Sequence, residues 1–326
     1  MQDECREEIR GLREFYRAIP EVVGRMRGVL NERSCVGEGN PCTVPSPESV
    51  VHIIQLGRQV LFPEFFIQSW IDPDNLEYAL GQKTKELFEH LSHQIVLSLR
   101  HDCLRSNVPC SRCVRQGHEQ AFEFLRSLPT LRRQLELDVL AAMEGDPAAK
   151  GFEDVVFSYP GHFALLVQRM AHILLGLEIP LLPRMMTEHA HSLTGIDMNP
   201  GAKIGDRFFM DHGTGIVIGE STIIGDRVRI YQGVTLGAHS LPRDAGDRYR
   251  DTKRHPTIED DVIIYSNATI LGGDTVIGAR SIIGGNVWLT ESVPPDTKVL
   301  LKRPELIYIG NGQQKAPGRG EGGAHA

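Results

Sequence analysis

The sequence predicts an α+β protein in which a helical domain is followed by a parallel β-helix of hexapeptide repeats. Two observations predict this fold. Up to about residue 192 apolar residues recur every three or four positions, and beyond Gly195 they recur every six. We therefore divide the 326 residues into a helical domain at 1–192, a β-helix domain at 193–305 and a tail at 306–326. The tail is poor in apolar residues, so we expect it to be disordered.

The helical domain contains several amphipathic segments with recognisable ends. Ser46 followed by Pro47 is typical of a helix start, with Ser46 as the N-cap. Helices are predicted after it, in the segments VVHIIQLGRQVLF, NLEYALGQKTKELFEHLSHQIVLSLRHDC, EQAFEFLRSLPTLRRQLELDVLAAME, PGHFALLVQRMAHILLGLEIP (ending near Gly176) and LLPRMMTEHAHSLTG.

The repeat of six residues is regular enough to predict a β-helix, in which three short strands per coil form a triangular prism. Ile218, Ile224, Ile230 and Leu236 are six apart, and the apolar residue of each hexapeptide is expected to point into the prism. The pattern slips by two residues between 210 and 218 and by one between 270 and 277, and a polar insert occupies 238–256. Such irregularities in a solenoid commonly carry function.

Composition narrows the class of protein. The net charge of −7 and the pI of about 6.0 argue against nucleic-acid binding. The start of the chain is acidic and resembles no signal segment, and no apolar run approaches the roughly 20 residues of a membrane span. We therefore expect a cytoplasmic protein that does not bind membranes.

All six cysteines lie in the first 113 residues. The simplest interpretation is reduced thiols within a helical domain, since a secreted disulfide scaffold would be smaller and denser in cysteine. The alternative is a metal or iron–sulfur site at Cys103, Cys110 and Cys113, with His101 or His118 as a further ligand.

The residues around the first slip and the insert are candidates for chemistry. His212 lies at the slip, directly after Asp211, and Asp197 precedes it by 15 residues, close to one coil. A carboxylate that orients an imidazole makes a general base near neutral pH, and such a base can deprotonate a hydroxyl that attacks a thioester. The alternative is that His212 is a corner residue with one backbone hydrogen bond.

Four stretches resemble the serine O-acetyltransferase family: GIDMNPGAKIGDRFFMDHGTGIVIGES, IYQGVTLGA, KRHPTIEDDVIIYSNATILGG and SVPP. The segment EGDPAAKGFEDVVFSYPGHFALLVQRMAH also resembles the last helical part of that family. The likeness is close from about 140 to 300 and looser before. It implies a left-handed β-helix that forms trimers, or hexamers joined by the helical domain, with acetyl-CoA bound between adjacent prisms.

The resemblance also implies roles for individual residues. His212 would be the catalytic base that takes the proton of the serine hydroxyl, and Asp197 its orienting carboxylate. Arg254 and His255 would hold the serine carboxylate. The remaining roles would fall to Asp146 and Asp211 on the serine amino group, and to Gly237, Ala238 and Ser266 as backbone contacts of acetyl-CoA. The product would be O-acetylserine for cysteine biosynthesis, made with no metal and no acyl-enzyme intermediate.

Each of these roles has a simpler alternative. Asp146 could be a helix N-cap, Arg254 a solvated loop charge and Asp197 a cap of the first coil, while His189, His191 and His239 are assigned to surface or loop. The whole chain could instead be an acyltransferase for another hydroxyl acceptor, a zinc lyase using His212, His239 and His255, or a non-catalytic solenoid.

The sequence also departs from the family's pattern. Asn199 stands where the family often has histidine, and the insert is longer than in enterobacterial-type members. The tail lacks the terminal isoleucine with which many members dock into cysteine synthase, so that complex is doubtful.

Overall fold

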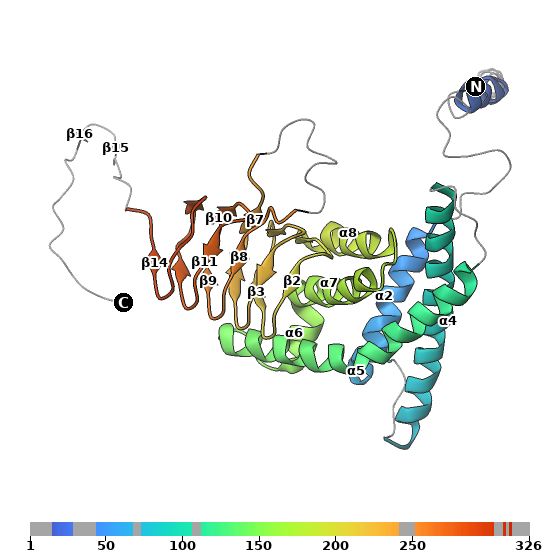
Figure 1. The fold of residues 1–326 in the computed structure, drawn as a ribbon, viewed down its shortest axis with the longest axis horizontal. Helices are drawn as coiled ribbons and strands as arrows, with labels where there is room; N and C mark the ends of the chain where they lie inside the picture. The colour runs from blue at the N-terminus through green and yellow to red at the C-terminus, as the bar shows by residue number, and fades with distance from the viewer. Residues whose placement is uncertain are drawn as a thin grey trace, which may run out of the picture.

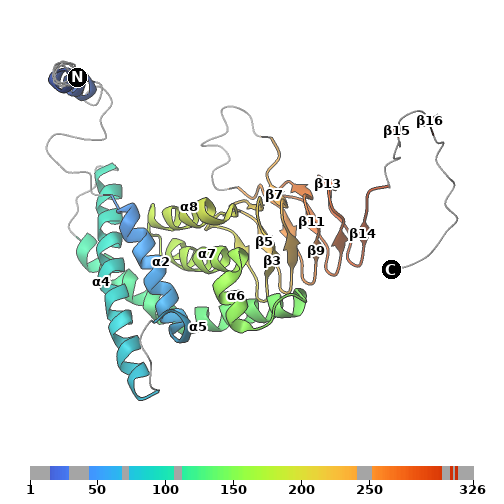
Figure 2. The same ribbon diagram turned by 180° about the vertical axis from the view of Figure 1, so that it is seen from behind.

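The computed structural model describes residues 15–28, 44–67, 73–105, 112–240 and 252–302, together with 309–310 and 313–314. A bundle of helices forms one end of the molecule, and a prism of short strands extends from it (Figure 1). The view from behind shows α7 and α8 lying between the prism and the outer helices α2 and α4 (Figure 2).

The helices follow the predicted segments. Ser46 caps the first of them and accepts a hydrogen bond from the Ser49 N–H at 3.3 Å, which confirms the predicted start. None of the described helices is both long enough and apolar enough to traverse a bilayer. The helices are α2 (Pro47–Leu61), α3 (Pro63–Phe66), α4 (Pro73–Arg105), α5 (Cys113–Gly145), α6 (Phe152–Ser158), α7 (Pro160–Gly176) and α8 (Leu182–Thr194), and residues 15–28 form a further, exposed helix.

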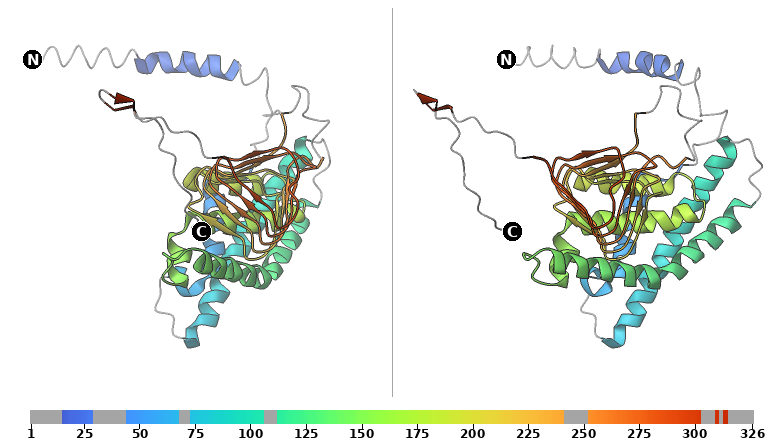
Figure 3. Two further views of the ribbon diagram at one scale, coloured as in Figure 1. Left: turned by 90° about the vertical axis from the view of Figure 1, so that its left-hand side faces the viewer. Right: turned by 60° about the vertical axis from the view of Figure 1, so that its left-hand side comes forward.

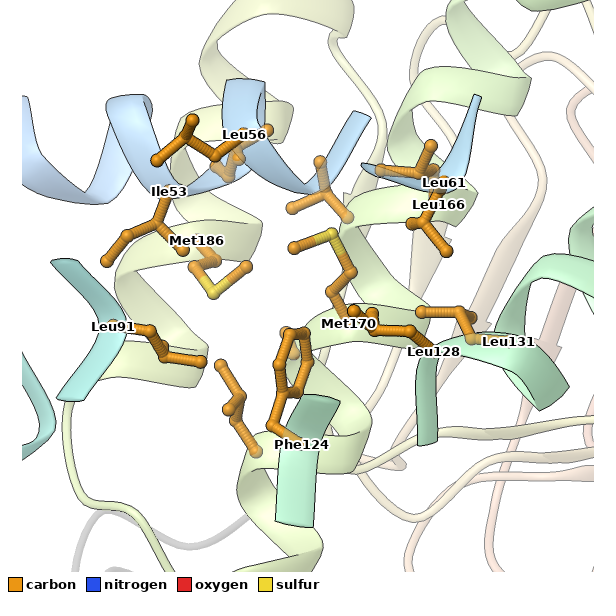
Figure 4. Packing of buried hydrophobic residues seen from close by; sticks show 14 of the residues in the cluster. Ile53, Leu56, Leu61, Leu91, Phe124, Leu128, Leu131, Leu166, Met170 and Met186 are labelled. Atoms are coloured by element: carbon orange, nitrogen blue, oxygen red, sulfur yellow. The ribbon is translucent and has the colours of Figure 1, made fainter. Parts of the chain in front are cut away.

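One apolar core holds the helices together. Ile53 and Leu56 of α2 face Leu91 of α4, and Phe124 of α5 and Met170 of α7 fill the space between (Figure 4). All five side chains are at most 1 % exposed. Full burial of side chains of this size stabilises the fold by roughly 1.5–3 kcal/mol each.

The β-helix consists of three parallel sheets that form the sides of a prism, seen along its length in Figure 3. Its left-handed class, expected from the resemblance, is that of the similar solved structures described below. Sheet A contains β1 (Asp197–Met198), β4 (Val217–Ile218), β7 (Thr235–Gly237), β10 (Thr269–Leu271) and β13 (Trp288–Leu289). Sheet B contains β2 (Lys203–Ile204), β5 (Ile223–Ile224), β8 (Thr257–Ile258) and β11 (Val276–Ile277). Sheet C contains β3 (Phe209–Asp211), β6 (Arg229–Tyr231), β9 (Ile263–Ile264), β12 (Ile282–Ile283) and β14 (Lys298–Val299).

The register of the strands confirms the hexapeptide prediction. Ile218 pairs with Leu236 one coil later, and Ile224 pairs with Ile258 across the insert. All four side chains are at most 3 % exposed, so they point into the prism as expected. The insert therefore leaves the register of the coils on either side unchanged.

The ends of the predicted domains can be compared with the observed elements. The last helix ends at Thr194 and the first strand begins at Asp197. Most of the predicted tail at 306–326 lies outside the described residues. Within it, β15 (Ile309–Gly310) and β16 (Gln313–Gln314) pair in an antiparallel manner.

Two of the cysteines considered as metal ligands lie close together. The Sγ atoms of Cys103 and Cys113 are 3.6 Å apart, where α4 ends and α5 begins. Cys110 lies outside the described residues. His118 Nδ1 is 2.7 Å from the Val114 carbonyl oxygen, one turn earlier in the same helix. The choice between thiols and a metal site stays open.

His162 of α7 is buried where the helices meet the prism. Its ring packs edge-on against Phe62 with 5.7 Å between centroids, and its Nε2 has no hydrogen-bond partner within the described part of the chain. Burial lowers the pKa of His162 to about 3, and the charges of Arg58 and Arg169 act in the same direction. The ring is therefore neutral in the folded protein.

We expect the protein to lose stability as the pH falls below 6.5. In this range His162 binds a proton in the unfolded chain but stays neutral in the folded chain, so protonation favours unfolding. The stabilisation is present above the unfolded pKa, and its loss approaches about 1.4 kcal/mol per pH unit between about 6.5 and 3. Urea unfolding of wild type and His162→Leu at pH 7 and pH 5 measures this loss. The difference between the two proteins in how the free energy of unfolding changes with pH is the contribution of His162. Equal pH dependence of the two would refute the assignment.

Candidate active site

The predicted site residues lie on two different edges of sheet A. We call the corners that join sheet C to sheet A edge CA, and those that join sheet A to sheet B edge AB. His212 lies on edge CA between β3 and β4, whereas Arg254 and His255 lie on edge AB directly before β8. One side of the prism, six residues at about 3.3 Å each, is about 20 Å long. A single chain therefore keeps these two groups apart.

Edge CA presents the candidate base to solvent. His212 has φ of +58° at the corner, and its side chain is 71 % exposed. Its Nε2 is 3.7 Å from Asp211 Oδ1. This corner runs from residue 212 to 216 and contains Gly213 and Gly215, both with positive φ, whereas the equivalent corner between β6 and β7 is only 232–234. The predicted slip of two residues is thus an enlarged corner that carries His212.

Asp197 lies near this corner but has other neighbours. It begins β1 and is in register with Val217, one coil away. Its carboxylate lies within 4.8 Å of ligand atoms of Glu188 and His191 on α8. Among the described residues no hydrogen bond or ion pair joins Asp197 to His212, and the carboxylate nearest to the imidazole is that of Asp211.

Asp146 follows α5 and approaches edge CA from the helical domain. It is the C-cap of α5, so its alternative interpretation as a helix N-cap is wrong. Its Oδ2 accepts a hydrogen bond of 2.6 Å from the Tyr159 hydroxyl, and its Oδ1 accepts one of 2.8 Å from the Ala148 N–H. These bonds, led by that of Tyr159, lower the pKa of Asp146, with a smaller contribution from His212. The carboxylate is therefore fixed and ionised.

We expect Tyr159→Phe to raise the KM for an amino-bearing substrate about two- to tenfold, because one ordinary hydrogen bond of about 0.5–1.5 kcal/mol no longer orients Asp146. The effect on kcat should be smaller, since Tyr159 acts through Asp146. Steady-state kinetics tests this, with Tyr78→Phe on the exposed surface of α4 as the matched control. A fall in kcat at constant KM would contradict the positioning role.

Edge AB holds Arg254 and His255 through a network around Ser221. The backbone N–H groups of both residues donate to Ser221 Oγ, at 2.9 and 3.1 Å. The guanidinium of Arg254 forms an ion pair with Glu220 and is 21 % exposed. Lys253 Nζ donates to the carbonyls of Ser221 at 2.7 Å and His255 at 2.5 Å. Arg254 is therefore held in place, which argues against a loosely solvated loop charge.

His255 is neutral and has a defined proton position. Its Nδ1 accepts a hydrogen bond of 3.1 Å from the Ser221 N–H, so the ring proton resides on Nε2. Burial lowers its pKa to about 4, helped by the positive charges of Arg254 and Lys253. The ring lies against Gly219, where a Cβ would be 1.9 Å from Cδ2. Only glycine fits there, and His255 can donate one hydrogen bond from Nε2.

The residues expected to contact acetyl-CoA are divided in the same way. Gly237 ends β7 and Ala238 follows it, so both lie toward edge AB. Ser266 follows β9 and lies on edge CA, where its carbonyl accepts a 2.9 Å hydrogen bond from the Asn286 N–H one coil later. Each edge thus carries a different half of the predicted substrate site and a different part of the predicted acetyl-CoA site.

Comparisons with known proteins show the family of this chain. No protein-family model matches the chain. The plasmid serine acetyltransferase of Synechococcus elongatus is 47 % identical over 255 residues, which cover 77 % of this chain and 80 % of that protein. This chain belongs to the serine acetyltransferase family. The prediction from the sequence is thereby confirmed.

Further serine acetyltransferases are similar in sequence and fold. That of Mycobacterium tuberculosis is 45 % identical over 163 residues, covering 50 % of this chain and 67 % of its own length. The structure of Entamoeba histolytica serine acetyltransferase 1 with L-cysteine has a TM-score of 0.66 and 34 % identity, covering 79 % of this chain and 87 % of that one. The Neisseria gonorrhoeae enzyme with serine has a TM-score of 0.51 and 25 % identity, covering 76 % and 97 %.

The arrangement of histidines within one chain does not support a zinc lyase. His212 lies on edge CA and His255 on edge AB, and these two with His239 do not form a group of converging ligand atoms within the described chain. The catalytic zinc of such enzymes needs three protein ligands around one ion. The membership of the serine acetyltransferase family accords with this.

Sequence reasoning missed the residues that hold the two halves of the site in place. Tyr159, Ser221, Glu220 and Lys253 act through their neighbours, so no motif of reactive side chains marks them. Tyr159 bonds to a residue 13 positions away and Ser221 to one 34 positions away. Only the fold brings these pairs together.

Proposed function

We propose that this chain transfers the acetyl group of acetyl-CoA to the hydroxyl of L-serine, giving O-acetylserine and CoA for cysteine biosynthesis. Membership of the serine acetyltransferase family supports the reaction. The observation that carries the assignment of residues is the division of charge between the two edges. Edge CA offers carboxylates and a base, and edge AB offers a guanidinium and an imidazole N–H.

An α-amino acid matches this division. Asp146 and Asp211 are anionic partners for the ammonium group of serine, and the Arg254 guanidinium and His255 Nε2–H are donors for its carboxylate. Arg254 must exchange or share its ion pair with Glu220 to bind the substrate. A sugar would use neither set of charges, which favours an amino-acid acceptor over another alcohol.

His212 acts as the general base in this mechanism. Its ring nitrogen takes the proton of the serine hydroxyl while the serine oxygen attacks the acetyl carbonyl carbon. The C–S bond then breaks, and the proton on His212 passes to the departing CoA thiolate. A carboxylate stabilises the imidazolium that forms, either that of Asp197, as the family resemblance implies, or that of Asp211, 3.7 Å away. Backbone groups of Gly237, Ala238 and Ser266 position the thioester and pantetheine.

The complete site forms between chains. In a trimer with three-fold symmetry, edge CA of one prism faces edge AB of the next, so each interface joins the two halves. The helical domain then stands at the outer end of each prism, where it can join two trimers into a hexamer. The first test is acetyl transfer to serine, measured beside a panel of sugars and other amino acids. Equal or faster transfer to a sugar would overturn the substrate assignment.

We expect two inactive variants to restore each other's activity when their subunits are mixed. Co-expressed His212→Asn and Arg254→Ala should recover about a quarter of wild-type activity, because half the chains supply each intact edge at random. His212→Asn mixed with Asp146→Asn is the matched control and should stay inactive, since both changes affect edge CA. Recovery in neither mixture would place the site within one chain.

A further inference from the structure

A cluster of two imidazoles and a carboxylate lies on the surface of the helical bundle, outside the site on the β-helix. It consists of His52 on α2 and Glu86 and His90 on α4. One ligand atom from each residue lies within 4.8 Å of the other two. Glu86 and His90 are four residues apart, so they project from the same face of α4. We propose that these three residues bind a divalent transition-metal ion of the zinc class that links α2 to α4.

The distances fit one ion shared by the three residues. His52 Nε2 and Glu86 Oε1 are 3.4 Å apart, which is long for a hydrogen bond between them. Two donors that each lie about 2.0–2.1 Å from a tetrahedral zinc ion are separated by about 3.4 Å. The rings of His52 and His90 meet edge to face, with 4.5 Å between centroids, so the histidines already converge.

The helices hold the three ligands in place. Leu87, which follows Glu86, is fully buried. Leu91, which follows His90, and Ile53, which follows His52, are also fully buried (Figure 4). The backbone N–H of Ser46 donates a 2.9 Å hydrogen bond to Gln94 Oε1, so the start of α2 is also fixed to α4. The ligands therefore project from the rim of a packed seam and need little rearrangement to bind.

The charges around Glu86 leave one oxygen for the metal. Lys83 Nζ is 2.8 Å from Oε2 and forms an ion pair with it. Glu86 Oε1 is the atom that faces His52. Lys83 also competes electrostatically with a bound cation. The side chains of His52 and Glu86 are 44 % and 36 % exposed, so water can complete the coordination of the metal.

The donor set selects the class of metal. Imidazole nitrogens with one carboxylate suit zinc, nickel or copper, whereas magnesium and calcium require mainly oxygen ligands. An ion held by two helices binds the folded chain better than the unfolded chain, so it stabilises the helical domain by mass action. The ion would strengthen the domain without taking part in acetyl transfer.

The test uses the full chain, stripped with a chelator, and zinc alone as the probe. Titration against a chromophoric chelator should show a site on the wild type that His52→Ala or His90→Ala weakens at least about tenfold, since one of three ligands is lost. His93→Ala, an exposed histidine one turn further along α4, is the matched control and should bind as the wild type does. His191→Ala controls for the group near Asp197 and should also leave this site unchanged.

Two further readouts make the outcome decisive. Cobalt should give tetrahedral d–d absorption in the wild type that disappears in His90→Ala, and magnesium should not displace it. Lys83→Met should bind zinc more tightly than the wild type, because a competing cation is removed. Zinc binding of the same stoichiometry and affinity in the His52→Ala/His90→Ala double variant would overturn the proposal, whatever the outcome of the acetyl-transfer assays.

Discussion

Replacing His212 should lower the turnover number about 100-fold or more, the usual scale for loss of a general base. Asparagine is the better replacement than alanine, because His212 has φ of +58° and asparagine tolerates this left-handed conformation. His212→Asn therefore removes the base with little strain at the corner. Initial rates at saturating serine and acetyl-CoA measure the effect.

The matched control is His189→Ala, a histidine of α8 that takes no part in the proposed site. It should keep wild-type turnover. Full turnover by folded His212→Asn would show that the base is another group or that the reaction needs none.

Two carboxylates compete for the role of stabilising the imidazolium. The resemblance assigns it to Asp197, whereas the structure places Asp211 at 3.7 Å from the ring. The carboxylate that acts will lower kcat when changed to asparagine and will shift the acidic limb of the pH–rate profile, which follows the His212 pKa, to lower pH, because the imidazolium loses its stabilising charge. The other change will mainly affect substrate binding.

The repeating part of the fold could be predicted from the sequence because its register is local. Each buried residue, such as Ile218 or Leu236, recurs at a fixed spacing and pairs with its equivalent one coil away. The helices were predictable for the same reason, because short stretches of sequence contain both their apolar faces and the Ser46 cap. The coils and the helices both depend on contacts between residues that are close in sequence.

The arrangement of the site could be predicted only in part. His212, Arg254 and His255 were found from the slips and the insert, but their division between two edges of sheet A follows from the strand order. The spacing of 15 residues suggested that Asp197 would orient His212, but it gave no sign that Asp211 would lie 3.7 Å from the ring. A spacing counted in residues cannot reveal how the backbone of an enlarged corner places its side chains.

The largest effect on stability should come from Arg169 of α7, which joins the helical domain to the first coil. Its guanidinium makes two hydrogen bonds to Asp138 of α5, at 2.8 and 2.9 Å, and donates to the carbonyls of Ile204 and Gly205 at 3.1 and 2.7 Å. Asp138 also accepts a 3.0 Å hydrogen bond from the Phe208 N–H. Arg169 and Asp138 are only 4 % and 3 % exposed.

We expect Arg169→Met to lower the free energy of unfolding by about 3–5 kcal/mol, because it leaves a buried carboxylate and two carbonyls without their partner. Burial raises the pKa of Asp138 to about 6 against the opposing effect of Arg169, so removing Arg169 leaves a buried carboxyl group whose ionised form has lost its main stabilising partner. Urea unfolding measures the loss. Arg115→Ala, which breaks an exposed ion pair with Glu119 on α5, is the control and should unfold as the wild type does.

The double variant Arg169→Met/Asp138→Leu separates a buried charge from the pair's own contribution. It should recover much of the lost stability, because neither charge then remains buried alone. No recovery would mean that the bonds to Ile204, Gly205 and Phe208 carry the stabilisation. The C-cap of α5 is Asp146, two turns beyond Asp138. Loss of the contact between Arg169 and Asp138 should therefore also raise the KM for serine. The anchor between the domains would then hold a substrate-binding carboxylate in place as well as the fold.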